Sequence, residues 1–468
     1  MKTNNIRGKT KKRKSKNTLG TVKINSNKLW GTTTQRTLNK FSVGKEKVSY
    51  DFIKSIIMIK KAINLVNLKH NKISKKIGES INQACETLLR KNHREHFPLM
   101  IWQCGSGTQI NMNVNEVIAN LADSISKQKL VSPTNHVNMF QSTNDIMPMA
   151  MNLTIIKVSR KKLIPELKFF EKILNQKTKQ FKNVVKLGKT HLKDAAPISL
   201  SQEYSSYLSQ IKQVRQNIKN SLNNLLNIPA GGTCVGTGLN TYKDFDRDVI
   251  NKLGETTGIK LKLSKNKFKD ISSHNEVLEF TASLNQLAVN LLKMSSDINL
   301  ASSGPVSGFD ELIMPVNEIG SSSMPGKFNN STTEMIASIA IKTISVHQLV
   351  TMALTHGNFQ LNVFKPLIIN EVLNNIRLVS DGLNVFARHT LRHIKPNYKK
   401  LKKDIDKSFV KYTKLTPILG YDFLSELYHK TRKNKTLNIE SEILKSKLLT
   451  KKQLKNLMNN NNLTTPYK

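Results

Sequence analysis

Apolar residues recur along this chain at helical spacing much more often than at the alternate spacing of a strand. Two series show the pattern: Leu163, Leu167, Phe170 and Leu174, followed later by Leu284, Leu287, Leu291, Met294 and Ile298. Side chains three and four positions apart lie on one face of a helix. Short breaks rich in Gly, Asn and Ser separate such segments. The pattern predicts an all-α fold built on a bundle of long helices.

The order of these segments predicts three domains, because a chain of 468 residues is too long for one simple core. We expect an N-terminal domain over residues 1–141, a central helical bundle over 142–395, and a small C-terminal domain over 396–468. Residues 1–18 contain a dense Lys/Arg run and almost no apolar side chains. We therefore expect them to form a basic, flexible tail.

Targeting and redox signals are weak. No apolar run reaches the ~20 residues that span a bilayer, and the N-terminus lacks the apolar core of a secretory signal. Cys85, Cys104 and Cys234 are odd in number and widely spaced, so they predict neither a disulfide framework nor a zinc site. We expect a cytoplasmic protein without a membrane partner. The mitochondrial matrix remains the alternative, although the basic N-terminus lacks an amphipathic apolar face.

The charge balance is strongly basic, with 74 Lys and Arg against 32 Asp and Glu and a net charge of +42. Such a balance raises nucleic acid as a partner. The lysines are spread along the whole chain, however, together with abundant Asn and Ile. That distribution is typical of compositional drift in an AT-rich genome, so nucleic-acid binding is not the expected main function. A positive field would also speed the approach of a dianionic substrate.

Four polar segments lie between the apolar helices and are rich in hydroxyls, amides and backbone N–H groups. They are residues 105–109, 141–145, 188–191 and 320–329. Each segment alone is more simply explained as a helix cap or a turn. Together they could bind carboxylate oxygens. None of them matches a P-loop, a dinucleotide fingerprint or a zinc motif.

Segment 320–329, Gly-Ser-Ser-Ser-Met-Pro-Gly-Lys-Phe-Asn, resembles the fumarase/aspartase superfamily signature, Gly-Ser-Ser-x-Met-Pro-x-Lys-x-Asn. Seven further blocks resemble class II fumarate hydratases in the same order: 28–36, 102–109, 111–120, 190–197, 231–240, 357–366 and 419–422. The resemblance implies a lyase that reversibly hydrates fumarate to L-malate in the tricarboxylic acid cycle, through a carbanion. It also implies no cofactor or metal, and a homotetramer whose active sites are shared between subunits.

Two alternatives remain open. Aspartate ammonia-lyases typically have Gly-Ala-Gly-Thr-Ser in the first block and Gln at the histidine position. Here Gly-Ser-Gly-Thr-Gln at 105–109 and His191 favour a fumarate hydratase, whereas Ser-Thr-Asn at 142–144 is the spelling of the ammonia-lyases. The alternative of another class is a non-catalytic, basic nucleic-acid-binding protein on a decayed lyase scaffold.

The resemblance also implies residue roles. Ser321 is the general base, His191 handles the water or leaving hydroxide, and Glu334 orients His191. The substrate-binding residues are Ser106, Gly107, Thr108, Ser142, Thr143, Asn144, Thr190, Lys327 and Asn329. A serine hydroxyl is a poor base, so its alkoxide needs stabilisation by neighbouring N–H groups and by Lys327. The lack of a cysteine cluster argues against the iron–sulfur class of fumarase.

Several positions depart from the family pattern. Those near the expected site are Lys189 in place of Arg, Lys193 in place of Gln, Val306 in place of Arg, Ser323 in place of Ile, and Asn330 in place of Pro. Ser132 replaces the histidine of an accessory dicarboxylate site, which puts that second site in doubt. Lys for Arg is not neutral where a bidentate contact is needed. Because none of these changes removes a proposed catalytic residue, we expect an active enzyme that is slower or less stable than typical members.

Overall fold

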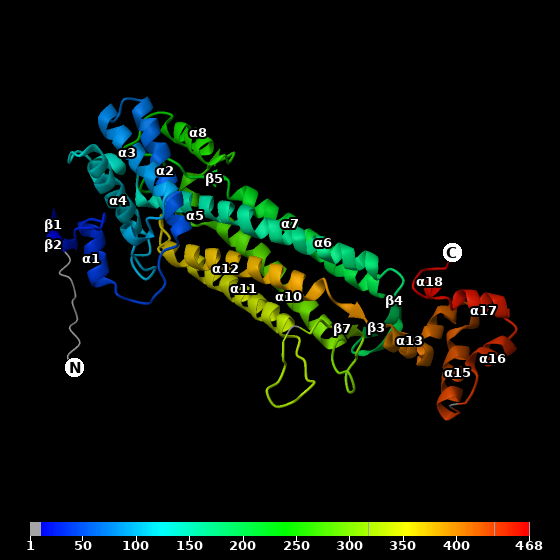
Figure 1. The fold of residues 1–468 in the computed structure, drawn as a ribbon. Coiled ribbons are helices and arrows are strands. Elements are labelled where there is room, and N and C mark those ends of the chain that lie inside the picture. The colour runs from blue at the N-terminus through cyan, green and yellow to red at the C-terminus, as the bar shows by residue number, and fades with distance from the viewer. Residues whose placement is uncertain (1–10, 317, 435, 468) are drawn as a thin grey trace, which may run out of the picture. The chain divides into compact units, whose positions relative to one another are not determined.

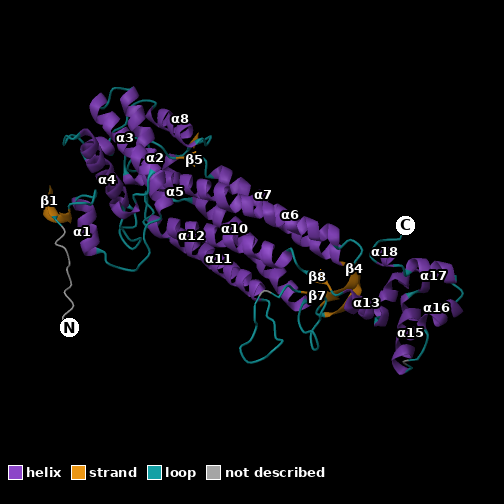
Figure 2. Cartoon of the chain, in the orientation of Figure 1, coloured by secondary structure: helices purple, strands orange, loops and turns teal. Residues whose placement is uncertain are grey.

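The computed structural model describes residues 11–316, 318–434 and 436–467. Helices dominate these residues, and the strands form four two-stranded sheets (Figures 1 and 2). The all-α class predicted from the apolar periodicity is therefore confirmed. The predicted polar breaks between helices also agree with the structure, since the segments 188–197 and 302–330 lie outside the long helices.

Two compact units make up the chain. Unit 1 comprises Met1–Ile164, Gln216–Gln286 and Lys342–Val379, and unit 2 comprises Pro165–Arg215, Leu287–Ile341 and Ser380–Lys468. Each unit thus combines three stretches that are far apart in sequence. The three-domain division at residues 141 and 395 stays a prediction.

Among the described residues, unit 1 contains five helices from the N-terminal part of the chain and two from later in the sequence. They are α1 (Thr32–Lys40), α2 (Tyr50–Lys69), α3 (Lys75–Arg90), α4 (Thr108–Ser126), α5 (Thr143–Val158), α8 (Phe245–Thr257) and α9 (Lys267–Ser272). The short parallel strands β5 (Asn227–Ile228) and β6 (Lys262–Leu263) also belong to it. Helix α2 is the centre of this unit, because it packs against α3, α5 and α8.

The N-terminal segment corrects one expectation. Residues 12–25 form an antiparallel hairpin of β1 (Lys12–Asn17) and β2 (Gly20–Asn25), beside α1 (Figure 1). The flexible tail expected over 1–18 is therefore wrong for residues 12–18, and residues 1–10 lie outside the described residues. The pairing was hidden because almost every side chain in β1 is polar, whereas the buried anchor, Ile24, lies in β2.

Five long helices continue the fold: α6 (Ile164–Gln180), α7 (Leu200–Asn224), α10 (Asn275–Ala301), α11 (Ser331–Thr355) and α12 (Lys365–Phe386). The two apolar series that predicted helices both lie in the core. Leu167, Phe170 and Leu174 are fully buried, and Leu284, Leu291 and Ile298 are at most 1% exposed. Their burial supplies the main stabilisation of these helices, at about 25 cal/mol per Å² of apolar surface.

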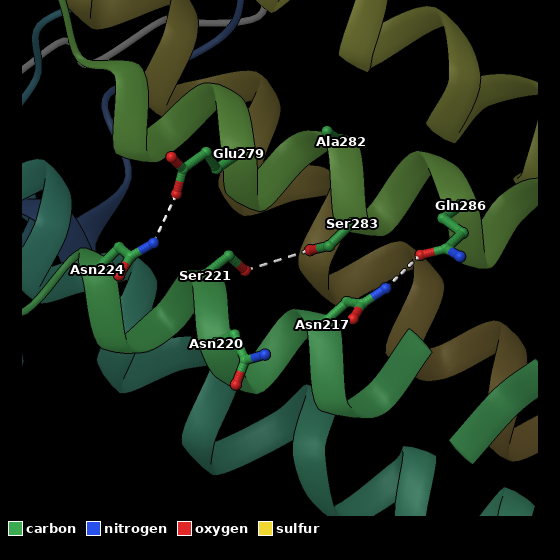
Figure 3. A pocket seen from close by; sticks show the side chains of 8 residues that line it. All are labelled: Asn217, Asn220, Ser221, Asn224, Glu279, Ala282, Ser283 and Gln286. Carbon is green, nitrogen blue, oxygen red and sulfur yellow. Dashed lines mark hydrogen bonds between the residues drawn. The ribbon is translucent and has the colours of Figure 1, made fainter. Parts of the chain in front are cut away.

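A polar ladder joins α7 to α10 within unit 1 (Figure 3). Asn224 Nδ2 donates to Glu279 Oε2 at 2.7 Å, the hydroxyls of Ser221 and Ser283 are 3.3 Å apart, and Asn217 Nδ2 donates to Gln286 Oε1 at 2.8 Å. These side chains line a groove of about 380 Å³. Three rungs at successive helical turns fix the register of the two helices.

Unit 2 has a separate C-terminal core. Its helices are α13 (Tyr398–Lys407), α14 (Thr416–Leu419), α15 (Tyr421–Lys433), α16 (Ile439–Lys445), α17 (Lys451–Leu457) and α18 (Asn460–Leu463). Leu415, Leu424, Ile443 and Leu454 are among the buried residues that pack together there. The unit also contains the hairpin β3 (Val185–Thr190) and β4 (Lys193–Ser199), and the short pair β7 (Leu312–Ile313) and β8 (Lys395–Pro396).

Helix α11 differs from the expectation that no apolar run is long enough for a bilayer. In the described part of the chain it is the one helix that is long and apolar enough to cross a membrane. Only 33% of its most apolar 18 residues are buried. Ile341 and Met352 are 59% and 65% exposed. The core helices of soluble proteins can be equally long and apolar. An exposed apolar surface of this kind is typical of a binding site for another protein chain.

Candidate active site

Residues 103–109 form a tight loop that leads into α4 in unit 1. Gly107 precedes the helix with φ 82°, a left-handed conformation that favours glycine. The hydroxyls of Ser106 and Thr108 are 2.9 Å apart. Gly105 is held against the backbone of 363–365, where Lys365 N donates to Gly105 O at 3.1 Å. A Cβ on Gly105 would overlap Val363 O, so only glycine allows this approach.

Residues 142–145 begin α5 with a capping box. Ser142 Oγ accepts from the Asn144 backbone N–H at 3.2 Å, and Ser142 N donates to Asp145 Oδ1 at 3.0 Å. The other carboxylate oxygen of Asp145 accepts from Thr233 N at 3.0 Å. Asn144 Nδ2 donates to Cys234 O at 2.8 Å. The cap thus ties the predicted binding residues Ser142 and Asn144 to the glycine-rich segment that follows residue 230.

The structure brings these two predicted binding segments together. Asn111 Nδ2, in the first turn of α4, lies 3.1 Å from Thr143 Oγ1 at the start of α5. Gly107 lies against Met147, whose side chain occupies the position of a Cβ. Two helix N-termini with hydroxyl side chains therefore lie side by side. Free N–H groups and the helix dipoles at such termini favour a bound anion.

A buried lysine supports this pair of termini, and no pattern in the sequence predicted it. Lys60 on α2 is 1% exposed and donates to Asn138 Oδ1 at 2.9 Å and Gln141 Oε1 at 2.7 Å. Asn111 Nδ2 donates to the same Asn138 oxygen at 3.1 Å. Burial lowers the pKa of Lys60 to about 7, against the opposing effect of Asp145. Burial likewise raises the pKa of Asp145 to about 7.

In unit 2, Thr190 and His191 lie at the tip of the β3–β4 hairpin. His191 and Leu192 form the turn with φ 53° and 57°, the left-handed pair that a two-residue hairpin requires. Both Thr190 and His191 are exposed. Among the described residues, the His191 side chain has no hydrogen bond or ion pair.

A charged cluster holds the base of this hairpin. Lys186 Nζ lies 2.8 Å from Glu311 Oε2 and 2.9 Å from Glu203 Oε2, and Lys189 pairs with the other oxygen of Glu311. Lys186 and Glu311 are buried. Burial opposes the charge on Lys186, but Glu203 and Glu311 outweigh it and raise the pKa of the ammonium group. Glu311 was not predicted, because its partners are more than 120 residues away in sequence.

Segment 320–329 closes on itself in a glycine-flanked loop in unit 2. Gly320 N donates to Lys327 O at 3.2 Å, and Asn329 Nδ2 donates to Gly320 O at 2.9 Å. Within the loop, Ser321 Oγ accepts from the backbone N–H groups of Ser323 at 3.2 Å and Met324 at 3.1 Å. Lys327 is exposed. The hydroxyl oxygen of Ser321 thus faces two N–H donors of the kind that stabilise developing negative charge.

Glu334 lies in the first turn of α11 and is exposed. Its carboxylate has no hydrogen bond or ion pair with the residues that the structure describes. The expected pair of Glu334 and His191 is therefore not formed within this chain, and the pairing stays a prediction.

Three of the positions that depart from the family pattern make ordinary structural contacts. Lys189 pairs with Glu311, and Asn330 Nδ2 donates to Ser302 Oγ at 2.7 Å and Asn299 Oδ1 at 2.9 Å. Ser132 caps the helical turn Pro133–Val137 by accepting from Asn135 N at 3.1 Å. Val306 is 97% exposed. In the described residues, no group of three or more His, Cys, Asp or Glu side chains could hold a metal ion.

Comparison with known proteins places this arrangement in a family. Residues 20–344 match the model of the lyase family. The fumarate hydratase class II of Rickettsia bellii is 38% identical over 92% of this chain and 96% of its own, and the mitochondrial fumarate hydratase of Schizosaccharomyces pombe is 37% identical over 91% and 83%. The crystal structure of class II fumarase from Schistosoma mansoni has a TM-score of 0.92, with 34% identity over 96% of this chain and 98% of that one.

A second solved structure, a fumarate lyase:delta crystallin from Brucella melitensis, also has a TM-score of 0.92, at 28% identity over 97% of this chain and all of that one. The protein is therefore a lyase of the fumarase/aspartase fold. Within that class, the chain belongs to the class II fumarate hydratases.

Proposed function

We propose that this chain hydrates fumarate reversibly to L-malate with Ser321 as the general base. The observation that carries the proposal is the loop 320–329, in which Ser321 Oγ accepts from two backbone N–H groups. Family membership and similarity over most of the chain support the same reaction. The neighbouring ammonia-lyase reaction has less support, because the relatives described above are fumarate hydratases or fumarate lyases.

The reaction requires removal of a weakly acidic proton from the carbon next to a carboxylate. Ser321, as an alkoxide, takes that proton from malate. The N–H groups of Ser323 and Met324 and the ammonium group of Lys327 stabilise the negative oxygen. The resulting carbanion spreads its charge onto the adjacent carboxylate, where Lys327 and Asn329 hold it.

On the other side of the substrate, His191 assists the departure of the hydroxide and, in reverse, the addition of water. Glu334 orients the imidazole. Thr190, which precedes His191 in the chain, binds a substrate oxygen next to the imidazole. The hairpin turn presents His191 to solvent, so the imidazole is free to engage groups from another chain.

The second carboxylate binds at the paired N-termini of α4 and α5. Ser106, Gly107 and Thr108 come from the first terminus, and Ser142, Thr143 and Asn144 from the second. Their hydroxyl, amide and backbone N–H groups are the donors that a carboxylate needs. Holding both carboxylates fixes the reacting carbon in front of Ser321.

We further propose a homotetramer in which these groups meet between subunits. Exposed apolar side chains on the long helices support it, with Val289 at 51%, Ile341 at 59% and Met352 at 65%. Burying such a surface against identical helices removes it from water. The cytoplasm is the proposed compartment. The mitochondrial matrix is the alternative, because a mitochondrial relative matches almost as well as the bacterial ones.

The test is the absorbance of fumarate formed by purified protein from L-malate or L-aspartate in parallel cuvettes. We expect the protein to form fumarate from malate but not from aspartate, and we expect Ser321→Ala to form none from malate. Ser323→Ala, which removes the neighbouring hydroxyl but keeps the N–H donor, serves as the matched control and should retain most activity. Fumarate from aspartate would overturn the assignment in favour of an ammonia-lyase. A folded protein inactive on both would contradict it and favour the non-catalytic alternative.

A further inference from the structure

The N-terminal hairpin lies in a long, strongly basic segment of the chain. Residues 1–45 contain 13 Lys and Arg and no Asp or Glu, whereas the rest of the chain has about two basic residues for each acidic one. General enrichment in lysine would leave acidic residues in place. The combination of 13 basic side chains with no acidic one therefore gives this segment more net charge than the average composition of the chain would give.

The inner face of the hairpin is fixed to unit 1. Arg13 donates to Trp30 O at 2.5 Å and Lys28 O at 3.2 Å, the hydroxyls of Ser15 and Thr32 are 2.9 Å apart, and Ile24 is fully buried. Arg36 on α1 donates to Leu19 O in the turn at 2.6 Å. These anchors hold the strands in one orientation.

The outer face consists of lysines. Because side chains alternate across a strand, anchoring Arg13 and Ser15 turns Lys12, Lys14 and Lys16 outward, and all three are exposed. On the other strand Lys23 is exposed directly opposite Lys14. None of these four lysines has an ion-pair partner among the described residues. Like charges directly opposite one another destabilise a sheet, so folding alone does not favour this arrangement.

We propose that this lysine face, Lys12, Lys14, Lys16 and Lys23, binds the phosphate backbone of nucleic acid without sequence preference. Alternate residues on a strand repeat at about 6.8 Å, so three lysines form a straight row with the fourth beside its centre. A linear row fits a linear polyanion. The hairpin has no aromatic side chain to stack on bases. We therefore expect binding to depend on the phosphate charge and not on the base sequence.

An anionic membrane fits the same face less well. Stable binding of a peripheral segment to lipid needs apolar side chains that enter the bilayer. The outward residues on the two strands are four lysines, Thr21 and the half-buried Asn25. Leu19 in the turn is the single exposed apolar residue of the hairpin. The charge is therefore not accompanied by an inserting surface.

The test uses the full-length protein, a fluorescein-labelled 20-nucleotide thymidine oligomer, and anisotropy over a salt series. The hairpin variant is Lys12→Gln, Lys14→Gln, Lys16→Gln and Lys23→Gln. The control variant, with the same loss of charge, is Lys430→Gln, Lys451→Gln, Lys452→Gln and Lys455→Gln, four exposed lysines in α15 and α17. Fumarate formation from malate, unchanged in both, shows that each is folded.

We expect the hairpin variant to bind the oligomer at least tenfold more weakly at low salt. The slope of log K against log [salt] should fall in magnitude by about 2.8, at roughly 0.7 for each lysine on a single strand. The control should change the slope by less than one unit. Equal loss in both variants would overturn the proposal in favour of a diffuse field. Equal binding of the oligomer by the parent and the hairpin variant would also overturn it. So would a hairpin variant that loses binding to phosphatidylserine vesicles but still binds the oligomer.

Discussion

Lys186 and Glu311 form a buried ion pair, with Lys186 Nζ 2.8 Å from Glu311 Oε2. The same carboxylate also binds Lys189. Lys186 and Lys189 belong to β3, which ends at Thr190 and leads into His191, whereas Glu311 belongs to the segment that leads towards Ser321. One carboxylate therefore connects the two elements of unit 2 that supply the proposed catalytic groups.

Glu311→Gln is expected to destabilise the protein by about 1–3 kcal/mol, because it removes one of the two carboxylates that pair with the buried ammonium group of Lys186 and leaves only Glu203. It should also lower kcat more than it changes KM, since the His191 turn loses its support. Urea unfolding and malate kinetics measure the two effects. Asp404→Asn, which breaks the partly exposed pair with Lys400, is the control, and it should change stability by no more than ~1 kcal/mol. An unchanged kcat in Glu311→Gln would refute the link to His191.

Lys60→Met is expected to raise KM for malate by roughly tenfold with a smaller change in kcat, because a buried charged hydrogen bond contributes about 1.5–3 kcal/mol. Lys60 holds Asn138 and Gln141, which lead into the binding residues Ser142–Asn144. The adjacent Lys61→Met removes a lysine that pairs instead with Glu86, so it should leave KM unchanged.

The pH dependence gives a second measurement of Lys60. Its pKa is lowered to about 7, chiefly by burial, so the ammonium loses its charge as pH rises through 7. Its charge-assisted hydrogen bonds then weaken to neutral ones. KM of the parent should therefore rise from pH 6 to 8. This rise should be smaller in Lys60→Met, in which Asp145, whose pKa burial raises to about 7, still titrates in the same range. The same pH dependence in both proteins would exclude Lys60 as its source.

The buried His274 is expected to lower the stability of the folded protein at acidic pH. Burial, and then the charge of Lys365, lower its folded pKa to about 3 from the ordinary 6.5. A depressed folded pKa means that the unfolded chain binds the extra proton between these values. Stability is therefore present above pH 6.5 and is lost as pH falls towards 3, by up to roughly 4–5 kcal/mol from this group.

His274→Asn isolates that contribution, because Asn tolerates the left-handed backbone at this position, φ 57°. Unfolding free energies measured from pH 7 to 4 should fall less steeply in the variant than in the parent. Parallel curves would show that His274 does not take up the proton.

The sequence predicted the helices well, because their cores repeat every three or four residues. Leu284, Leu287 and Leu291 on α10 are buried as that spacing requires. The β1–β2 hairpin was missed because it rests on Ile24 and on polar anchors such as Arg13, which carry no apolar alternation. In the sequence, the lysines of this segment look like those of a disordered tail. Only the pairing of the two strands shows that they lie on one face.

The predicted binding residues were found through resemblance, and the structure adds their supports. Lys60 and Glu311 contact partners about 80 and 120 positions away in sequence, and no local pattern marks a buried charge whose partner is that distant. His191 and Glu334 are a different case. Their pairing is expected from resemblance but is not formed within one chain, so it depends on the proposed assembly.

The most direct test of the account is complementation between two inactive variants, Ser321→Ala and His191→Asn. If each active site takes Ser321 and His191 from different subunits, unfolding and refolding an equal mixture should recover about a quarter of the parent's malate activity, since random assembly gives that share of intact sites. Each variant refolded alone is the control and should stay inactive. Mixed tetramers that form without regaining activity would contradict the shared site.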